Sequence, residues 1–203
     1  QTIRAVNKPL RIAIVGKYFA TGEYQLRDSY AALIDAIDHA AWQTGVSTKV
    51  NWIQAEKLEK DIGEDLKGAG GIIVPIGWGP RGVEGKIKAI EYARTHHIPY
   101  FGLCYGMQLL VIEYARNVLG WTDANTAEIN PQAEKVVIDI MPDQKKLLAE
   151  GKYGASMRLG AYTAKLLTGS IAQKAYGAEI ISERHRHRYE VNPAYVGEIA
   201  SAG

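Results

Sequence analysis

The chain has 203 residues, of which 47% are hydrophobic and 23% charged, and these values exclude a disordered or collagen-like protein. With 24 Lys and Arg against 22 Asp and Glu, the net charge is +2, which gives no electrostatic reason to expect nucleic-acid binding. The single cysteine excludes an internal disulfide and a Cys-rich zinc site. No signal-peptide pattern opens the chain, and no apolar run approaches the ~20 residues that span a bilayer. We therefore expect a soluble, cytoplasmic protein that folds as a single domain over residues 1–203 and binds no membrane.

Through the first 120 residues or so, short β-branched runs alternate with segments of helical periodicity. The expected strands are Arg11–Tyr18, Ser47–Ile53, Gly70–Gly77 and Ile98–Cys104, and the expected helices are Gln25–Thr44, Val83–His96 and Gly106–Leu119. Strands of nearly continuous hydrophobicity are typical of a parallel sheet that is covered by helices on both faces.

The last third of the chain has a different pattern, because its apolar segments follow one another without long helices. Strands are expected at Val136–Met141, Ser156–Leu167 and Ala178–Val191, with a polar loop at Lys145–Gly154. These strands predict an antiparallel extension of the parallel core. The predicted fold class is therefore α/β: a three-layer, mostly parallel sheet with helices on both faces and an antiparallel extension.

Cys104 lies where a predicted strand ends and a predicted helix begins, with Gly102 and Gly106 on either side. Small residues at these positions permit the sharp strand-to-helix turn of a nucleophile elbow, which exposes its side chain at the carboxyl end of the sheet. We expect the helix N-terminus to favour the thiolate, and the Tyr105 amide to point towards a developing oxyanion. The alternative is an ordinary buried thiol, which is the usual role of a free cysteine. The two glycines favour the catalytic interpretation.

A second candidate is the Gly-rich loop Pro75–Gly82, which follows the preceding strand of the predicted sheet. The carboxyl ends of neighbouring parallel strands meet at one edge, so this loop should lie beside Cys104. Its glycines allow backbone amides to approach a ligand closely. Taken alone, the pattern is also compatible with a surface turn.

A third candidate is the run Arg184–Arg188, in which arginines and histidines alternate. In a strand, His185 and His187 face one side and the arginines face the other. The run is either an exposed basic face or a site for an anion or a partner. Two histidines are too few for a complete metal site. The remaining histidines, His39, His96 and His97, are expected to be structural.

Several segments resemble one known family. The stretches GLCYGMQL, VIEYARNVLG, DANTAEIN, VIDIMPDQ, MRLGAY and ISERHRHRYEVNP closely resemble the glutaminase domain of CTP synthases, which are class I glutamine amidotransferases. The resemblance runs from about Leu10 to Gly203. The Gly-x-Cys-x-Gly elbow is common to class I amidotransferases, whereas the Arg-His-Arg-His-Arg run is more particular to CTP synthases. The resemblance implies the flavodoxin-like core of that family.

The resemblance also implies an enzyme that hydrolyses L-glutamine to glutamate and ammonia. Cys104 would be the nucleophile and would form a γ-glutamyl thioester. The substrate-binding residues implied by position are Gly77, Tyr105, Gly106, Met107, Gln108, Glu128 and Arg188. Among them, Tyr105 would supply an oxyanion-hole amide and Glu128 would hold the α-amino end of glutamine. These roles agree with chemistry, since the α-amino group of glutamine needs an acceptor and its carboxylate needs donors.

In the family, the ammonia passes to a separate amidoligase domain that aminates ATP-activated UTP to CTP, a ligase reaction of pyrimidine biosynthesis. The resemblance implies no metal or organic cofactor in the glutaminase domain itself, with ATP, Mg²⁺ and the effector GTP acting in the full-length enzyme. The expected places for GTP are Trp78–Gly82 and Arg184–Arg188. Full-length members of the family are homotetramers.

The sequence departs from the family at two points. Ile76 stands where the family has a glycine whose amide contributes to the oxyanion hole, and a β-branched residue there is costly if φ must be positive. The family's general base lies in a Phe-His-Pro-Glu motif beyond the equivalent of Gly203, and no His-Pro-Glu occurs in this chain. Without that histidine we expect turnover to fall by orders of magnitude.

These departures leave alternatives open. Because the sequence shows neither the family's C-terminal segment nor its N-terminal synthase domain, we expect a truncated glutaminase, a glutaminase whose tail is not included, or a pseudo-enzyme. The rival functions are a non-catalytic glutamine-binding or regulatory module, a class I amidotransferase with another acceptor, and a metal protein that uses His185 and His187.

Overall fold

The computed structural model describes residues 9–17, 20–21, 24–25, 30–141, 144–145, 150 and 157–203. Its centre is a four-stranded parallel sheet in the order β4-β1-β5-β6. The strands are β1 (Leu10–Gly16), β4 (Thr48–Gln54), β5 (Gly71–Val74) and β6 (Tyr100–Gly102). The predicted parallel core is confirmed, and β5 and β6, which precede the two candidate loops, are neighbours in it.

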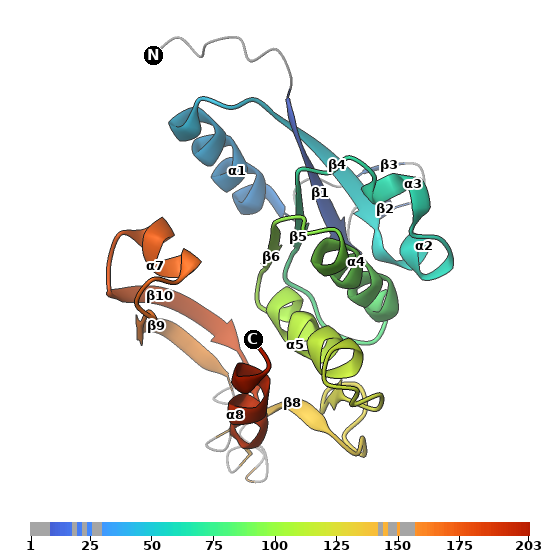
Figure 1. The fold of residues 1–203 in the computed structure, drawn as a ribbon, viewed down its shortest axis with the longest axis vertical. Coiled ribbons are helices and arrows are strands. Elements are labelled where there is room, and N and C mark those ends of the chain that lie inside the picture. The colour runs from blue at the N-terminus through green and yellow to red at the C-terminus, as the bar shows by residue number, and fades with distance from the viewer. Residues whose placement is uncertain are drawn as a thin grey trace.

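Helices cover both faces of this sheet (Figure 1). On one face, α1 (Ala31–Thr44) buries Ile37 against Ile14 of β1. On the other face, α4 (Val83–Thr95) and α5 (Tyr105–Asn117) pack on β5 and β6 and form the larger core cluster. Two short helices, α2 (Ala55–Lys60) and α3 (Gly63–Leu66), follow β4. The three-layer arrangement agrees with the prediction.

A pair of smaller sheets forms the C-terminal part. One has the order β11-β8-β7, in which β8 pairs antiparallel with β11 and parallel with β7. The other is an antiparallel β9–β10 hairpin that lies apart from the parallel sheet in Figure 1. The bounds are β7 (Asn125–Thr126), β8 (Val136–Ile140), β9 (Arg158–Lys165), α7 (Ile171–Tyr176), β10 (Ile180–His187), β11 (Tyr189–Val191) and α8 (Pro193–Ser201).

Two sequence expectations are wrong in detail. The helix expected from Gln25 begins at Ala31, and Gln25 belongs instead to the short β2–β3 hairpin (Ala20–Thr21 and Tyr24–Gln25). The single strand expected at Ala178–Val191 is broken at Arg188, because β10 pairs with β9 whereas β11 pairs with β8. The loop expected at Lys145–Gly154 lies mostly outside the described residues.

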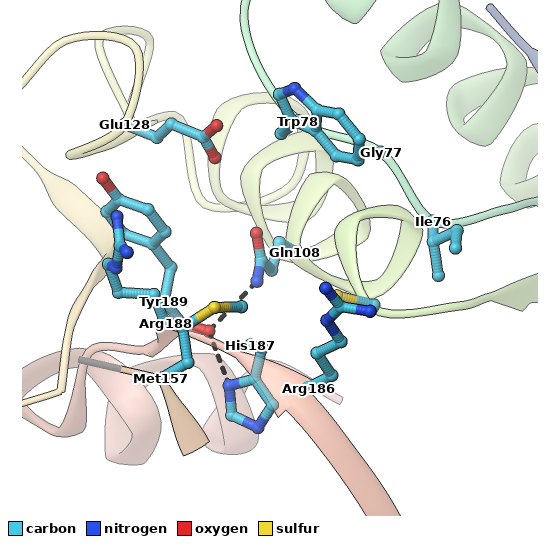
Figure 2. Close-up of a pocket in the computed structure, with 11 residues that line it drawn as sticks. Ile76, Gly77, Trp78, Gln108, Glu128, Met157, Arg186, His187, Arg188 and Tyr189 are labelled. Carbon is cyan, nitrogen blue, oxygen red and sulfur yellow. Dashed lines mark hydrogen bonds between the residues drawn. The ribbon is translucent and has the colours of Figure 1, made fainter. Parts of the chain in front are cut away.

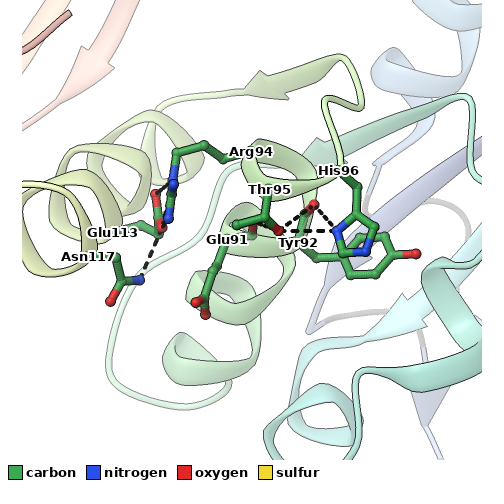
Figure 3. A network of polar contacts seen from close by, with 7 residues as sticks. All are labelled: Glu91, Tyr92, Arg94, Thr95, His96, Glu113 and Asn117. Carbon is green, nitrogen blue, oxygen red and sulfur yellow. Dashed lines mark hydrogen bonds and ion pairs between the residues drawn. The ribbon is translucent and has the colours of Figure 1, made fainter.

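An ion pair between α4 and α5 fixes the helix that follows Cys104 (Figure 3). The Glu113 carboxylate has no exposed surface and accepts from the Arg94 guanidinium, with a shortest N···O distance of 2.7 Å. Asn117 donates a further bond of 3.0 Å to the same carboxylate. A buried carboxylate with several donors is costly to disrupt, so α5 is held firmly against α4.

None of the helices in the described part of the chain combines the length and the hydrophobicity of a membrane span.

Candidate active site

Cys104 occupies a strained turn between β6 and α5. Its φ is 52° and its ψ is −99°, a conformation that non-glycine residues rarely adopt. The chain leaves β6 at Gly102 and enters α5 at Tyr105, so Cys104 is the N-cap residue of the helix. This is the predicted nucleophile elbow, and strain of this kind is typical of functional sites.

The two glycines beside Cys104 are required by close backbone packing. A Cβ added to Gly106 would lie 2.0 Å from the Val74 carbonyl oxygen, and one added to Gly102 would lie 2.6 Å from the Met107 nitrogen. Real Cβ atoms essentially never come this close to backbone. The Gly-x-Cys-x-Gly spacing therefore lets the start of α5 lie directly against β5 and β6.

The helix N-terminus favours the thiolate of Cys104 as expected, but other influences on its pKa are larger. Burial raises the pKa of its thiol above the usual value, and the nearby Glu128 carboxylate acts in the same direction. The Tyr105 N–H donates to the sulfur and partly opposes this rise. The helix terminus thus provides one favourable hydrogen bond, but desolvation outweighs it.

The loop between β5 and α4 (residues 75–82, the β5–α4 loop) is held from beneath by a lysine. The buried Lys17 amine donates to the carbonyl oxygens of Trp78, Gly79 and Arg81, the last two at 3.3 and 3.2 Å. The Tyr105 hydroxyl donates to the Gly79 carbonyl at 2.9 Å. These contacts turn the loop's carbonyl oxygens towards the protein interior.

Glu128 binds the loop from the opposite side. Its Oε1 accepts a 2.8 Å hydrogen bond from the Gly79 N–H. The Glu128 backbone N–H donates to the Thr126 hydroxyl at 3.2 Å, just after β7, and this bond fixes the turn that carries the carboxylate. One carboxylate oxygen therefore holds the loop, while the carboxylate as a whole borders the pocket described next.

A pocket of about 590 Å³ opens at this edge of the sheet (Figure 2). It is lined by Ile76, Gly77, Trp78, Cys104, Gln108, Glu128, Met157, Arg186, His187, Arg188 and Tyr189. Five of the eight residues predicted from the sequence meet here, namely Gly77, Cys104, Gln108, Glu128 and Arg188. Tyr105, Gly106 and Met107 form the first turn of α5 behind Cys104 and do not line the pocket.

A carbonyl group of β11 connects two side chains that line the pocket. The Tyr189 carbonyl oxygen accepts from Gln108 Nε2 at 3.0 Å and lies 3.1 Å from His187 Nδ1, as the dashed lines in Figure 2 show. A carbonyl accepts only, so His187 carries its proton on Nδ1 and its Nε2 accepts from His185 Nδ1 at 2.9 Å. Burial lowers the pKa of His187, which favours this neutral form. Both ring nitrogens of His187 are thus engaged away from Cys104.

The basic run is divided between two elements in this geometry. His185 and His187 share one side of β10, as predicted, and Arg184 is exposed. The strand ends at His187, so Arg188 does not continue a single arginine face. It lies in the bend before β11 and borders the pocket. Among the described residues, no group of three or more potential metal ligands occurs, so the two histidines are not part of a metal cluster there.

Sequence reasoning did not assign Met157 and Tyr189 to the site. Both residues lie in stretches that resemble the family, MRLGAY and ISERHRHRYEVNP, but neither was assigned a role there. The approach of the β9–β10 hairpin and β11 to α5 brings them to the pocket. Ile76 also lines the pocket, with 52% of its surface exposed. It is absent from the described non-glycine residues with positive φ, so the strain expected for a β-branched residue does not arise in this conformation.

Comparison with known proteins agrees with this geometry. Residues 25–202 match the family model "Glutamine amidotransferase class-I". CTP synthase of Pyrococcus furiosus is 46% identical over 200 residues, which cover 98% of this chain and 36% of the relative. CTP synthase of Pelotomaculum thermopropionicum is 47% identical over 193 residues, covering 95% of this chain and 34% of the relative. The chain therefore spans about a third of the length of these relatives.

A solved structure is similar in fold as well as in sequence. It is described as the glutaminase domain of Trypanosoma brucei CTPS with bound acivicin. The TM-score is 0.84 at 40% sequence identity, over 96% of this chain and 72% of the other.

Proposed function

The chain belongs to the class I glutamine amidotransferase family, and on that premise we propose that it is the glutaminase part of a CTP synthase. In this proposal it hydrolyses L-glutamine to glutamate and ammonia, with Cys104 as the nucleophile. The observation that carries the proposal is the strained Cys104 elbow beside a pocket that also holds the carboxylate of Glu128 and the guanidinium of Arg188.

This combination suits a free amino acid. A carboxylate favours the α-ammonium group of the substrate, and a guanidinium favours its α-carboxylate. The side-chain amide then extends towards Cys104, whose neighbouring backbone N–H groups are potential oxyanion donors. The apolar surfaces of Trp78 and Met157 border the space between the two ends.

The reaction we propose has two covalent steps. Sulfur attacks the amide carbon, negative charge develops on its oxygen, and the carbon–nitrogen bond then breaks as ammonia leaves with the thiol proton. Water adds to the resulting thioester, the sulfur–carbon bond breaks, and glutamate leaves with the thiol restored. Among the described residues, Cys104 is hydrogen-bonded to the Tyr105 amide and to no acid–base side chain. Proton movement therefore needs water or a group outside those residues.

By the same proposal, the ammonia serves an amidoligase domain that aminates UTP to CTP. The glutaminase step uses no metal or organic cofactor of its own, whereas ATP, Mg²⁺ and GTP act in the full-length, homotetrameric enzyme. Support comes from the CTP synthase relatives, which this chain matches over nearly its whole length.

The experiment that tests the proposal traps the thiol instead of relying on turnover. Acivicin, the ligand of the similar trypanosomal domain, is a chlorinated amino-acid analogue of glutamine. Sulfur adds at the carbon that bears chlorine, and the carbon–chlorine bond then breaks, so that chloride and the thiol proton leave. We expect one adduct on Cys104 that millimolar glutamine prevents. The proposal would be contradicted if iodoacetamide modified Cys104 as fast as acivicin does, or if glutamine did not slow the reaction with acivicin. Either result would indicate a thiol that is reactive without a glutamine pocket.

A further inference from the structure

Lys86, on the first turn of α4, is buried, and among the described residues its amine has neither a hydrogen-bond acceptor nor an ion-pair partner. Its side chain has 0% exposure. The nearby Lys17 differs, because its amine donates to three carbonyl oxygens of the β5–α4 loop. Lysines are almost never fully buried unless they are paired, so this one requires an explanation.

The Lys86 amine lies beneath the two backbone segments that border Cys104. A Cβ added to Gly77 would lie 3.2 Å from the Lys86 Nζ, so the amine is in contact with the underside of the pocket-lining loop. The same Nζ lies 5.2 Å from the centroid of the Tyr105 ring, and Tyr105 supplies the amide next to the sulfur. The amine is therefore next to Gly77, which lines the pocket, and near the ring of Tyr105.

The groups around Lys86 do not neutralise it. Burial and the neighbouring ammonium of Lys17 lower its pKa to about 8, Arg81 acts in the same direction, and Glu56 opposes them. The Glu56 carboxylate is itself paired with Arg81 at 3.4 Å. Lys86 is consequently charged at pH 7 and mostly neutral at pH 9. Titratable groups that are perturbed by burial and lie beside a pocket are typical of functional sites.

We propose that Lys86 is a positioning residue of the glutaminase site, whose charge beneath Gly77 stabilises the negative charge that develops on the substrate as Cys104 attacks. This inference rests on the proposed function. A cation shielded from water acts strongly at short range, and it needs no reorganisation during the reaction. Lys86 does not touch the substrate in this proposal, because its side chain is fully buried and does not line the pocket.

The test compares the wild type with Lys86→Met, which keeps the length and volume of the side chain but removes the amine. Lys88→Met on the same helix is the matched control, since the Lys88 amine binds the Glu59 carbonyl at 2.6 Å, on the exposed side of α4. The probe is acivicin, and the maximal rate of inactivation and the half-saturating concentration are measured from pH 6.5 to 9.5. Attack on acivicin also places negative charge on the substrate, here on the ring nitrogen, before chloride leaves.

We expect Lys86→Met to lower the maximal rate about tenfold at pH 7, with a half-saturating concentration within about twofold of the wild type. The ratio of the two rates should fall towards one between pH 7 and pH 9, because the wild type loses the charge. Two results would overturn the role of Lys86 and leave the proposed function standing. One is equal rates at pH 7, and the other is a rate ratio that does not change with pH, together with a higher half-saturating concentration for Lys86→Met. A wild type that does not react with acivicin would overturn the proposed function and this inference with it.

Discussion

Replacing Lys86 with methionine should stabilise the protein at neutral pH, because burying an unpartnered cation is unfavourable. Folding lowers the pKa of this lysine from 10.5 to about 8. Each pKa unit corresponds to 1.36 kcal/mol, so the charged form is disfavoured in the folded state by about 3 kcal/mol. Loss of the contact between the ammonium and the Tyr105 ring offsets about 1 kcal/mol of the gain. At pH 7 we expect Lys86→Met to raise the free energy of unfolding by about 2 kcal/mol.

The dependence on pH has a definite sign. The pKa of Lys86 is lower in the folded state, so between pH 8 and 10.5 the unfolded state binds more protons and the stability of the wild type rises with pH. The stability penalty is fully present below pH 8 and is relieved above it, so the advantage of the variant should disappear as pH approaches 10.5. Urea unfolding followed by tryptophan fluorescence at pH 7, 8.5 and 10 measures the difference, with Lys88→Met as the control. A variant less stable than the wild type at pH 7, or a difference that does not change with pH, would refute the reasoning.

Three further substitutions test the site. Gly106→Ala would place a Cβ 2.0 Å from the Val74 carbonyl oxygen. We expect the free energy of unfolding, measured by thermal unfolding, to fall by about 3 kcal/mol or more. A change under about 0.5 kcal/mol would contradict the close packing. Glu128→Gln keeps an acceptor for the Gly79 N–H but removes the charge that we propose binds the α-ammonium group. The half-saturating concentration of acivicin should then rise about 10- to 100-fold, and an unchanged value would exclude Glu128 from substrate binding. Ile76→Gly should change the maximal rate of inactivation by less than about twofold, since Ile76 has no positive φ; a tenfold increase would mean that the loop must adopt one during the reaction.

The parallel core was predictable because periodicity and burial agree over its whole length. β1, β4, β5 and β6 are short β-branched runs, and the helices between them present one apolar face. The position of Cys104 was predictable for a related reason, since glycines at Gly102 and Gly106 are needed wherever a strand and a helix meet so closely. These features depend on local sequence alone.

Other features depend on contacts between distant segments and left no local pattern. The run Ala178–Val191 has uniform strand character, and only its change of partner from β9 to β8 breaks it at Arg188. The raised pKa of Cys104 follows from desolvation, which the pattern of a helix N-terminus does not reveal. Lys86 has the sequence character of an exposed helical residue, yet the packing of the β5–α4 loop and Tyr105 encloses it.

The most direct test of the central claim is the intact mass of the chain before and after incubation with acivicin, with Cys104→Ala as the control. Because the chain has one cysteine, a single adduct identifies the site without further mapping. The account predicts one adduct on the wild type, none on Cys104→Ala, and protection by glutamine. An unmodified wild type, or an adduct that persists in Cys104→Ala, would contradict the assignment of Cys104 as a glutaminase nucleophile.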